Sequence, residues 1–192
     1  MEMTNREAAE SLAAVQQTVR RTRRSLSAYF CSDLLMLWGG IWILAFLGTH
    51  FQPHRAAWIW NGLVAPGVLV TILICRAAFG KGQPLRVGEE KRTLRRYFWV
   101  TWALYGCAWI AIARPTDGVQ FNALICTIVM FGYVVLGLML EDKLMIVLGL
   151  AITAVTLAGY FIIPRPWYCL WMAAAAGGPL FGTGLTVRMR WR

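Results

Sequence analysis

Residues 119–163 read VQFNALICTIVMFGYVVLGLML-EDK-LMIVLGLAITAVTLAGYFII. The two apolar runs, 119–140 and 144–163, contain no charged side chain. Each has about the 20 residues that a helix needs to cross roughly 30 Å of hydrocarbon. Only Glu141, Asp142 and Lys143 separate them. The stretch therefore predicts two membrane-spanning helices joined by a tight charged turn, with the two acids favoured at the positive start of the second helix.

Four more runs of this kind occupy most of the remaining chain, at residues 34–48, 56–75, 97–113 and 166–187. Apolar side chains make up 58% of the sequence, and its mean hydropathy is +0.55. The predicted fold class is an all-α membrane protein with six transmembrane helices over residues 31–188. Six spans leave little chain for a folded domain outside the bilayer.

The 19 Lys and Arg residues set the orientation. When the six runs are threaded alternately, all but Arg55, Arg114 and Arg165 fall on one side. Cytoplasmic segments retain Lys and Arg, so we expect three hairpins with short outer loops, cytoplasmic termini and a basic tail at 189–192. Arg114-Pro115-Thr116-Asp117-Gly118 is expected to form one outer turn, with Gly118 free to take a positive φ. We expect a bacterial inner (plasma) membrane location.

The formal net charge of +10 lies beside the span ends, where it meets anionic lipid headgroups. These headgroups, and no nucleic acid, are the expected partners of the basic face. Residues 1–30 are predicted to form a basic amphipathic cytoplasmic helix. Its apolar stripe is Leu12, Val15, Val19, Thr22, Leu26 and Tyr29. Such a helix can lie on the membrane, pair in a homo-oligomer or dock a cytoplasmic protein, and the sequence leaves all three open.

A few polar residues inside the spans are candidate functional groups. Asp33 is the only acid between Ser25 and Thr49, and an ionisable group at membrane depth is by default a functional suspect. It is expected to cap the first span or pair with Arg76, or else to couple protons or cations. Asn61 and Asn122 lie near the outer ends of the second and fourth spans. Intramembrane amides join helices by hydrogen bonds or line a substrate cavity.

The sixth span has an unusual centre, AAAAGGPLFGTG at residues 173–184. Ala174, Gly178 and Gly182 recur every four residues and predict a face on which another helix packs closely, within the chain or across a homo-oligomer interface. Pro179 lacks an amide hydrogen and deprives the Ala175 carbonyl of its usual donor. The span is expected to be a kinked packing helix or a gating helix with exposed carbonyls.

The remaining residue types indicate no metal, cofactor or catalytic site. His50 and His54 flank Pro53 in a short outer loop, and the five cysteines form no C-x-x-C pair. An aromatic belt at the two interfaces accounts for nine of the ten tryptophans, with Trp38 lying deeper. Three functions stay open. The leading one is transport or channel activity for a neutral or weakly charged solute. The others are a membrane-embedded regulatory or assembly subunit whose basic face binds a partner, and an intramembrane enzyme.

Overall fold

The computed structural model describes residues 32–80, 89–140 and 142–190, and every regular element in these ranges is helical. The predicted helix over residues 1–30 lies outside them. In chain order the elements are the helix Ser32–Phe51, η1 (Pro53–Arg55), α2 (Ala56–Gly80), α3 (Glu89–Ala113), α4 (Gly118–Leu140), α5 (Lys143–Ile162), η2 (Arg165–Trp167), α6 (Tyr168–Met172), η3 (Ala173–Gly177) and α7 (Gly178–Arg190).

Five segments are helices long and apolar enough to cross a membrane: Ser32–Phe51, Pro53–Ala77, Gly118–Met139, Lys143–Ile162 and Arg165–Arg190. These confirm five of the predicted runs as apolar helices. The run at 97–113 is also helical, within α3, but its apolar part Tyr97–Ala113 is shorter. Its helix begins earlier, at Glu89, because the charged lead-in continues the same helix.

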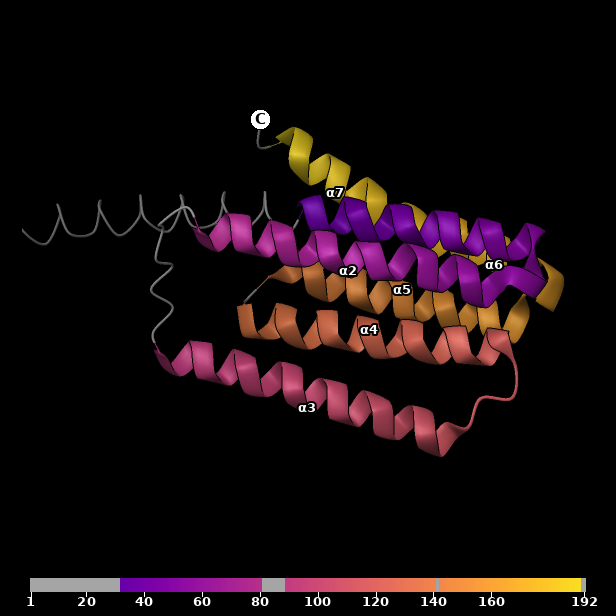
Figure 1. Cartoon of the computed structure of the whole chain (residues 1–192), viewed down its shortest axis with the longest axis horizontal. Coiled ribbons are helices and arrows are strands. Elements are labelled where there is room, and N and C mark those ends of the chain that lie inside the picture. Colours follow the sequence, from indigo (N-terminus) through magenta and orange to yellow (C-terminus); the bar gives the residue numbers. More distant parts are fainter. Residues whose placement is uncertain (1–31, 81–88, 141, 191–192) are drawn as a thin grey trace, which may run out of the picture.

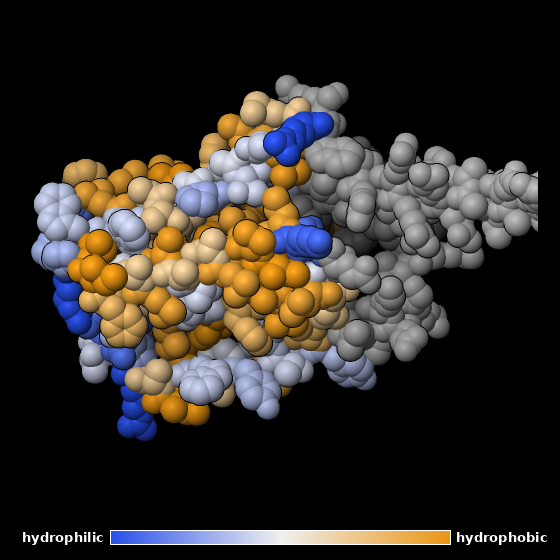
Figure 2. Space-filling view, turned by 180° about the vertical axis from the view of Figure 1, so that it is seen from behind, coloured by the Kyte–Doolittle hydropathy of each residue, from blue (hydrophilic) through white to orange (hydrophobic). Residues whose placement is uncertain are grey.

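The helices lie side by side, and the chain reverses direction at each connection (Figure 1). Among the labelled elements, α4 and α5 make the most extensive contact, and α3 lies at the edge beyond α4. Apolar side chains cover much of the molecule between its two ends, and the most hydrophilic residues gather at those ends (Figure 2). This distribution suits a bundle surrounded by hydrocarbon along its length.

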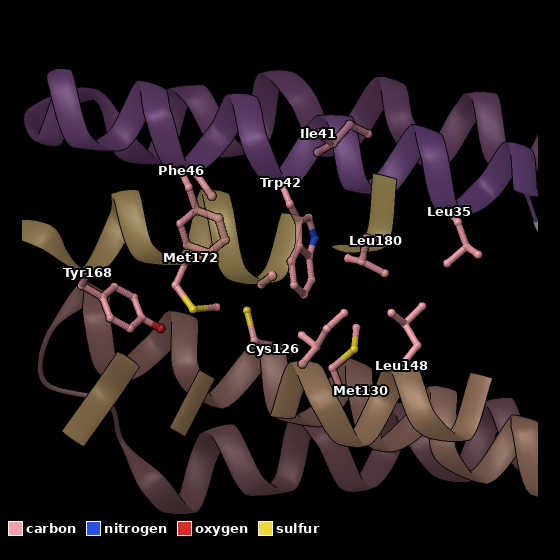
Figure 3. Close-up of a cluster of buried hydrophobic side chains, with 13 residues drawn as sticks. Leu35, Ile41, Trp42, Phe46, Cys126, Met130, Leu148, Tyr168, Met172 and Leu180 are labelled. Carbon is pink, nitrogen blue, oxygen red and sulfur yellow. The ribbon is translucent and has the colours of Figure 1, made fainter. Parts of the chain in front are cut away.

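The buried core lies between the helix Ser32–Phe51, α4, α5 and the α6–α7 segment (Figure 3). Its largest fully buried side chains include Phe46, Met130, Tyr168 and Met172. Trp42 is also buried there, edge-on to Phe46, so the aromatic-belt interpretation was wrong for Trp42. The core members from α6, η3 and α7 are Tyr168, Met172, Ala173, Ala176 and Leu180.

Glycines bring the backbone of the helix Ser32–Phe51 against the sixth span. A Cβ atom on Gly39 would overlap the backbone of Phe181, and one on Gly177 would lie 3.0 Å from the Ile43 nitrogen. A Cβ atom on Gly184 would lie 2.8 Å from the Ser32 carbonyl oxygen. Between helices in lipid the attraction comes from close packing rather than from the hydrophobic effect. These glycines therefore supply much of what holds the two helices together.

Trp102 joins α3 to α4 by a different device. Its indole N–H donates to the Ile128 carbonyl at 2.9 Å, and its Nε1 lies 2.9 Å from where a Cβ atom of Gly132 would be. Gly132 follows Ile128 by four residues and therefore lies one turn further along α4, beside the Ile128 carbonyl. Because glycine has no side chain, the indole has room to reach this carbonyl.

Trp171 repeats this arrangement between α6 and α5. Its indole donates to the Val155 carbonyl at 2.8 Å and lies over Gly159, again four residues later. Trp38 donates to the Thr71 hydroxyl of α2 at 3.2 Å. The interfacial belt is therefore an incomplete explanation for Trp171, as it is for Trp102, because both indoles also bind a neighbouring helix.

Two turns show how nearby residues end one helix and start the next. The Asp142 carboxylate accepts hydrogen bonds from the Leu144 and Met145 amides at the start of α5, as the predicted acidic helix start requires. The turn after α3 also forms, but the positive φ of 41° falls on Arg114 rather than on a glycine. Arg114 ends α3 in the left-handed region, which leaves Gly118 free to open α4.

Asp117 ties together the connection before α4 and the connection before α6. One carboxylate oxygen caps α4 by accepting the Gln120 amide at 2.8 Å. The other accepts a hydrogen bond from the Arg165 guanidinium, 48 residues further along the chain. The Gln120 bond first, and then Arg165, lower the pKa of the Asp117 carboxyl below its ordinary value of 3.8.

Glycine position within the sixth span can be tested directly. Gly184→Ala places a methyl group against the Ser32 and Met36 backbone, and we expect it to lower the free energy of unfolding by about 1–3 kcal/mol. Gly182→Ala is the matched control, because a Cβ atom there meets nothing within 4 Å. Its effect should stay within about 0.5 kcal/mol. Equal melting temperatures of the two variants in detergent would contradict the packing.

The Asp117 pair predicts a pH dependence of stability. A carboxyl whose folded pKa is depressed stabilises the fold above its unfolded pKa, here about 3.8, and loses that effect as the pH falls through the folded pKa. Asp117→Asn keeps a residue able to cap α4 but removes the charge. The melting-temperature gap between wild type and this variant should be constant above about pH 5 and shrink below about pH 4. A gap independent of pH would disprove the assignment.

Candidate functional site

Asp33 forms an ion pair with Arg188 where the start of the helix Ser32–Phe51 meets the end of α7. Arg188 Nη1 lies 3.1 Å from Asp33 Oδ1, and the two side chains are 35% and 29% exposed. The predicted partner was Arg76, which is exposed on α2. The described residues show the pair with Arg188 instead, and the α7 backbone lies against Ser32 and Met36 beside it.

The sequence around Gly184 explains why α7 takes that place. Gly184 lets the α7 backbone touch the Ser32 carbonyl and the Met36 amide. Arg188 follows Gly184 by four residues and therefore projects from the same face of α7, where it meets Asp33. Sequence reasoning missed Arg188 because it grouped this residue with the cytoplasmic positive charges that set orientation.

The two asparagines stand apart from the buried core. Asn61 is exposed on α2. The Asn122 amide donates to the Gly118 carbonyl of its own helix at 3.2 Å. Each lies in the first two turns of its helix, and the described contacts give no hydrogen bond between them. Their predicted part in lining a cavity stays a prediction.

The sixth span is one helix with a π-helical turn at its centre, next to the predicted proline break. Residues Ala173–Gly177 form the π-helical turn η3, in which the Gly178 amide donates to the Ala173 carbonyl five residues earlier. Pro179 follows at once and supplies no amide hydrogen. A wider turn next to a proline redirects backbone carbonyls, and π-turns of this kind are frequent at functional sites.

The face of the sixth span that packs inside the bundle lies beside the face that was predicted to pack. Ala174 is exposed, and a Cβ atom on Gly178 or Gly182 would meet nothing within 4 Å. The buried positions are instead Ala173, Ala176, Gly177, Leu180 and Gly184. Close packing of the predicted face inside the chain is thus absent from the described structure, and packing across a homo-oligomer interface stays a prediction.

Three polar atoms are buried without a hydrogen-bond partner in the part of the chain that the structure describes. They are the Thr49 hydroxyl, the Trp60 indole nitrogen and the Tyr168 hydroxyl. Tyr168 as a whole is 1% exposed. Sequence reasoning missed these residues, because each is adjacent to an outer turn and reads as interfacial. Only the packing around them shows that they are buried.

The two histidines beside Pro53 have different surroundings. The His50 ring is stacked on Trp167, with centroids 6.3 Å apart, and lies edge-on to Phe51. His54 is exposed in η1. Among the residues whose side chains are described, no group of three His, Cys, Asp or Glu residues could hold a metal ion.

Comparison with protein-family models, with curated proteins and with solved structures found no match.

A double-mutant cycle tests the ion pair between Asp33 and Arg188. Asp33→Asn and Arg188→Met should each destabilise the protein, and their effects should couple by up to about 1 kcal/mol, as for a partly exposed pair. Arg76→Met, the control, should show no coupling to Asp33→Asn. Melting temperatures of the single and double variants in detergent provide the measurement. Coupling to Arg76 in place of Arg188 would restore the sequence-based pairing.

Proposed function

We propose that this chain is a small transport or channel-type membrane protein for a neutral or weakly charged solute. The observation that carries the proposal is the π-turn within the sixth span, α6–η3–α7. Backbone that departs from α-helical pairing is tolerated at membrane depth only where protein or a water-filled cavity covers it. Secondary transporters use discontinuous helices to present backbone groups to their substrate, and the π-turn with its following proline is a smaller departure of this kind from α-helical pairing.

The absence of charge among the described buried polar side chains supports a neutral solute. The described buried polar side chains are Ser32 and Thr156, and neither is charged. The π-turn itself adjoins the core, since Ala176 is 0% exposed and Met172 precedes the π-turn. A pathway along this helix would therefore offer hydroxyls, amides and carbonyls, which suit an uncharged molecule better than an ion.

The proposal includes six membrane crossings in three hairpins, with both termini in the cytoplasm of a bacterial inner membrane. The distribution of basic residues supports it: Arg55, Arg114 and Arg165 are the exceptions among 19. Anionic lipid headgroups are the proposed partners of the cytoplasmic face. Asp33 is a candidate for coupling protons or cations to transport, because its ion pair with Arg188 links the first and last of these crossings.

A regulatory or assembly subunit is the second candidate function, and the weak attachment of α3 favours it. This helix carries large exposed side chains, among them Leu104, Tyr105, Trp109 and Ile112. Its main described partner is α4. An apolar helix with so little contact inside its own chain offers a surface to a second membrane protein, although lipid covers such a face equally well.

Flux measurements on purified protein in liposomes separate the two functions. We expect water, glycerol, urea or acetamide to cross faster than in protein-free liposomes, with shrinkage followed by light scattering. Pro179→Ala restores an amide donor beside η3 and should change that flux by roughly tenfold, about 1.4 kcal/mol in the barrier. Pro66→Ala is the matched control, because Pro66 is exposed inside the continuous helix α2.

Wild-type liposomes no more permeable than protein-free ones would contradict transport of these solutes and favour the subunit. If flux is seen, Asp33→Asn tests coupling. Loss of the pH dependence of flux with unchanged stability is expected for a coupling acid, and loss of stability with unchanged flux for a structural one.

A further inference from the structure

The described links that hold the helices to one another fall into two groups. These links are the hydrogen bonds and ion pairs between helices, and the glycines at which a Cβ atom would lie within 3.4 Å of a neighbouring helix. One group joins the helix Ser32–Phe51, α2 and the sixth span from Gly177 onward, here named the first unit. The other joins α3, α4, α5 and α6, here named the second unit. In Figure 1, α2 and α7 lie in the upper part of the bundle, and α3 and α4 in the lower part.

In the first unit, α2 and α7 are both held to the helix Ser32–Phe51. A Cβ atom on Gly67 of α2 would overlap the Ile41 side chain, and the Trp38 indole donates to a hydroxyl of α2 at 3.2 Å. The same helix holds α7 through the backbone contact at Gly184 and through the ion pair at the end of α7. These three helices therefore share backbone contacts and polar bonds that resist their separation.

In the second unit, each helix is held to the next one along the chain. The Trp102 indole joins α3 to α4. A Cβ atom on Gly149 of α5 would lie 3.0 Å from the Met130 carbonyl oxygen of α4, and the Trp171 indole joins α6 to α5. The ion pair between the connections before α4 and before α6 adds a further link inside this unit.

The interface between the two units consists of another kind of contact. Figure 3 shows apolar side chains of the helix Ser32–Phe51 opposite those of α4 and α5, in one buried cluster. The His50 ring also stacks on Trp167 of η2, and α5 contacts η3 and α7. Hydrogen bonds depend on direction and weaken when they bend, whereas apolar side chains, methionine above all, can repack. A small rotation therefore costs less at this interface than inside either unit.

The sixth span passes from the second unit to the first within η3. Its α6 part is bonded to α5, and Gly177, the last residue of η3, already lies against the helix Ser32–Phe51. Helices bend at π-turns and at prolines, and both occur here, because Pro179 follows η3 closely. Pro179 has no amide hydrogen, so the Ala175 carbonyl loses the donor that would resist bending. The other covalent connection between the units, residues 81–88, lies outside the described ranges.

We propose that η3 is a hinge about which the first unit tilts as one body against the second unit. Hinges absorb a movement of two rigid bodies in a few residues, and η3 lies where the sixth span changes from one body to the other. The hinge goes beyond the proposed transport function and does not depend on it. Secondary transporters rock one bundle against another to expose a site to each side in turn, and the hinge supplies such a motion.

Pairs of spin labels on the full-length protein in lipid nanodiscs measure this movement directly. The labels replace four exposed side chains, one on each of α2, α7, α3 and α5: Leu73, Leu185, Leu104 and Val147. The pairs Leu73–Leu185 and Leu104–Val147 each lie within a unit, and the pairs Leu73–Leu104 and Leu185–Val147 join the two units. Each site occurs in both kinds of pair, so the mobility of the label itself affects both equally. We expect the distance distributions between units to be two-peaked or about twofold broader than those within units.

The labels require a background with fewer reactive thiols. The buried Cys126 stays in place, because it is 2% exposed and does not react in the folded protein. The other four cysteines are replaced by serine: Cys31, Cys75, Cys107 and Cys169. Hydrogen exchange on the unlabelled wild type is the second measurement. We expect faster exchange at η3 than in the middle of α5, and uniform protection along the sixth span would overturn the hinge.

Pro179→Ala locates the movement, because it gives back an amide donor next to η3. It should narrow the distributions between units toward the width of those within units. Pro66→Ala is the matched control, since Pro66 lies in α2, inside the first unit, and it should leave the distributions between units unchanged. Distributions between units as narrow as those within units would overturn the hinge, and so would equal broadening of both kinds. A protein that gives no flux but shows the movement would refute only transport.

Discussion

The backbones of the helix Ser32–Phe51 and of the sixth span touch at glycines on both sides. Gly39 lies on the backbone of Phe181, and Gly184 lies on Ser32. In hydrocarbon, two apolar helices gain nothing by hiding surface from water, so their association depends on how closely they approach. The same approach carries Arg188 to Asp33 and encloses one side of the core.

This contact also accounts for the irregular centre of the sixth span. Gly177 belongs to η3, and a Cβ atom there would lie 3.0 Å from the Ile43 nitrogen. The π-turn thus lies directly against the first described helix. The turn keeps a hydrogen bond of its own, from the Gly178 amide to the Ala173 carbonyl, and the neighbouring helix packs against it.

Hydropathy predicted the helices well, because each span depends mainly on the length and polarity of its own run. Features that depend on which helices become neighbours could not be predicted in this way. Asp33 had Arg76 as a reasonable partner in sequence, and only the packing of Gly184 selects Arg188. Likewise, small residues recur every four positions on the predicted face, which includes the uncovered Gly178, and the packed face beside it has the same spacing. Which of the two faces packs depends on how the helix is rotated about its axis, and no local sequence pattern determines that rotation.

The link between the first described helix and the last has a consequence for biosynthesis. Ribosomes add roughly 5–20 residues per second, so the helix Ser32–Phe51 reaches the membrane several seconds before its partner Gly177–Gly184 is made. Until then its glycine face has no matching surface from its own chain, and lipid or an insertion chaperone must cover it. Assembly of the bundle is therefore completed from the carboxyl end, when the last segment docks onto the first.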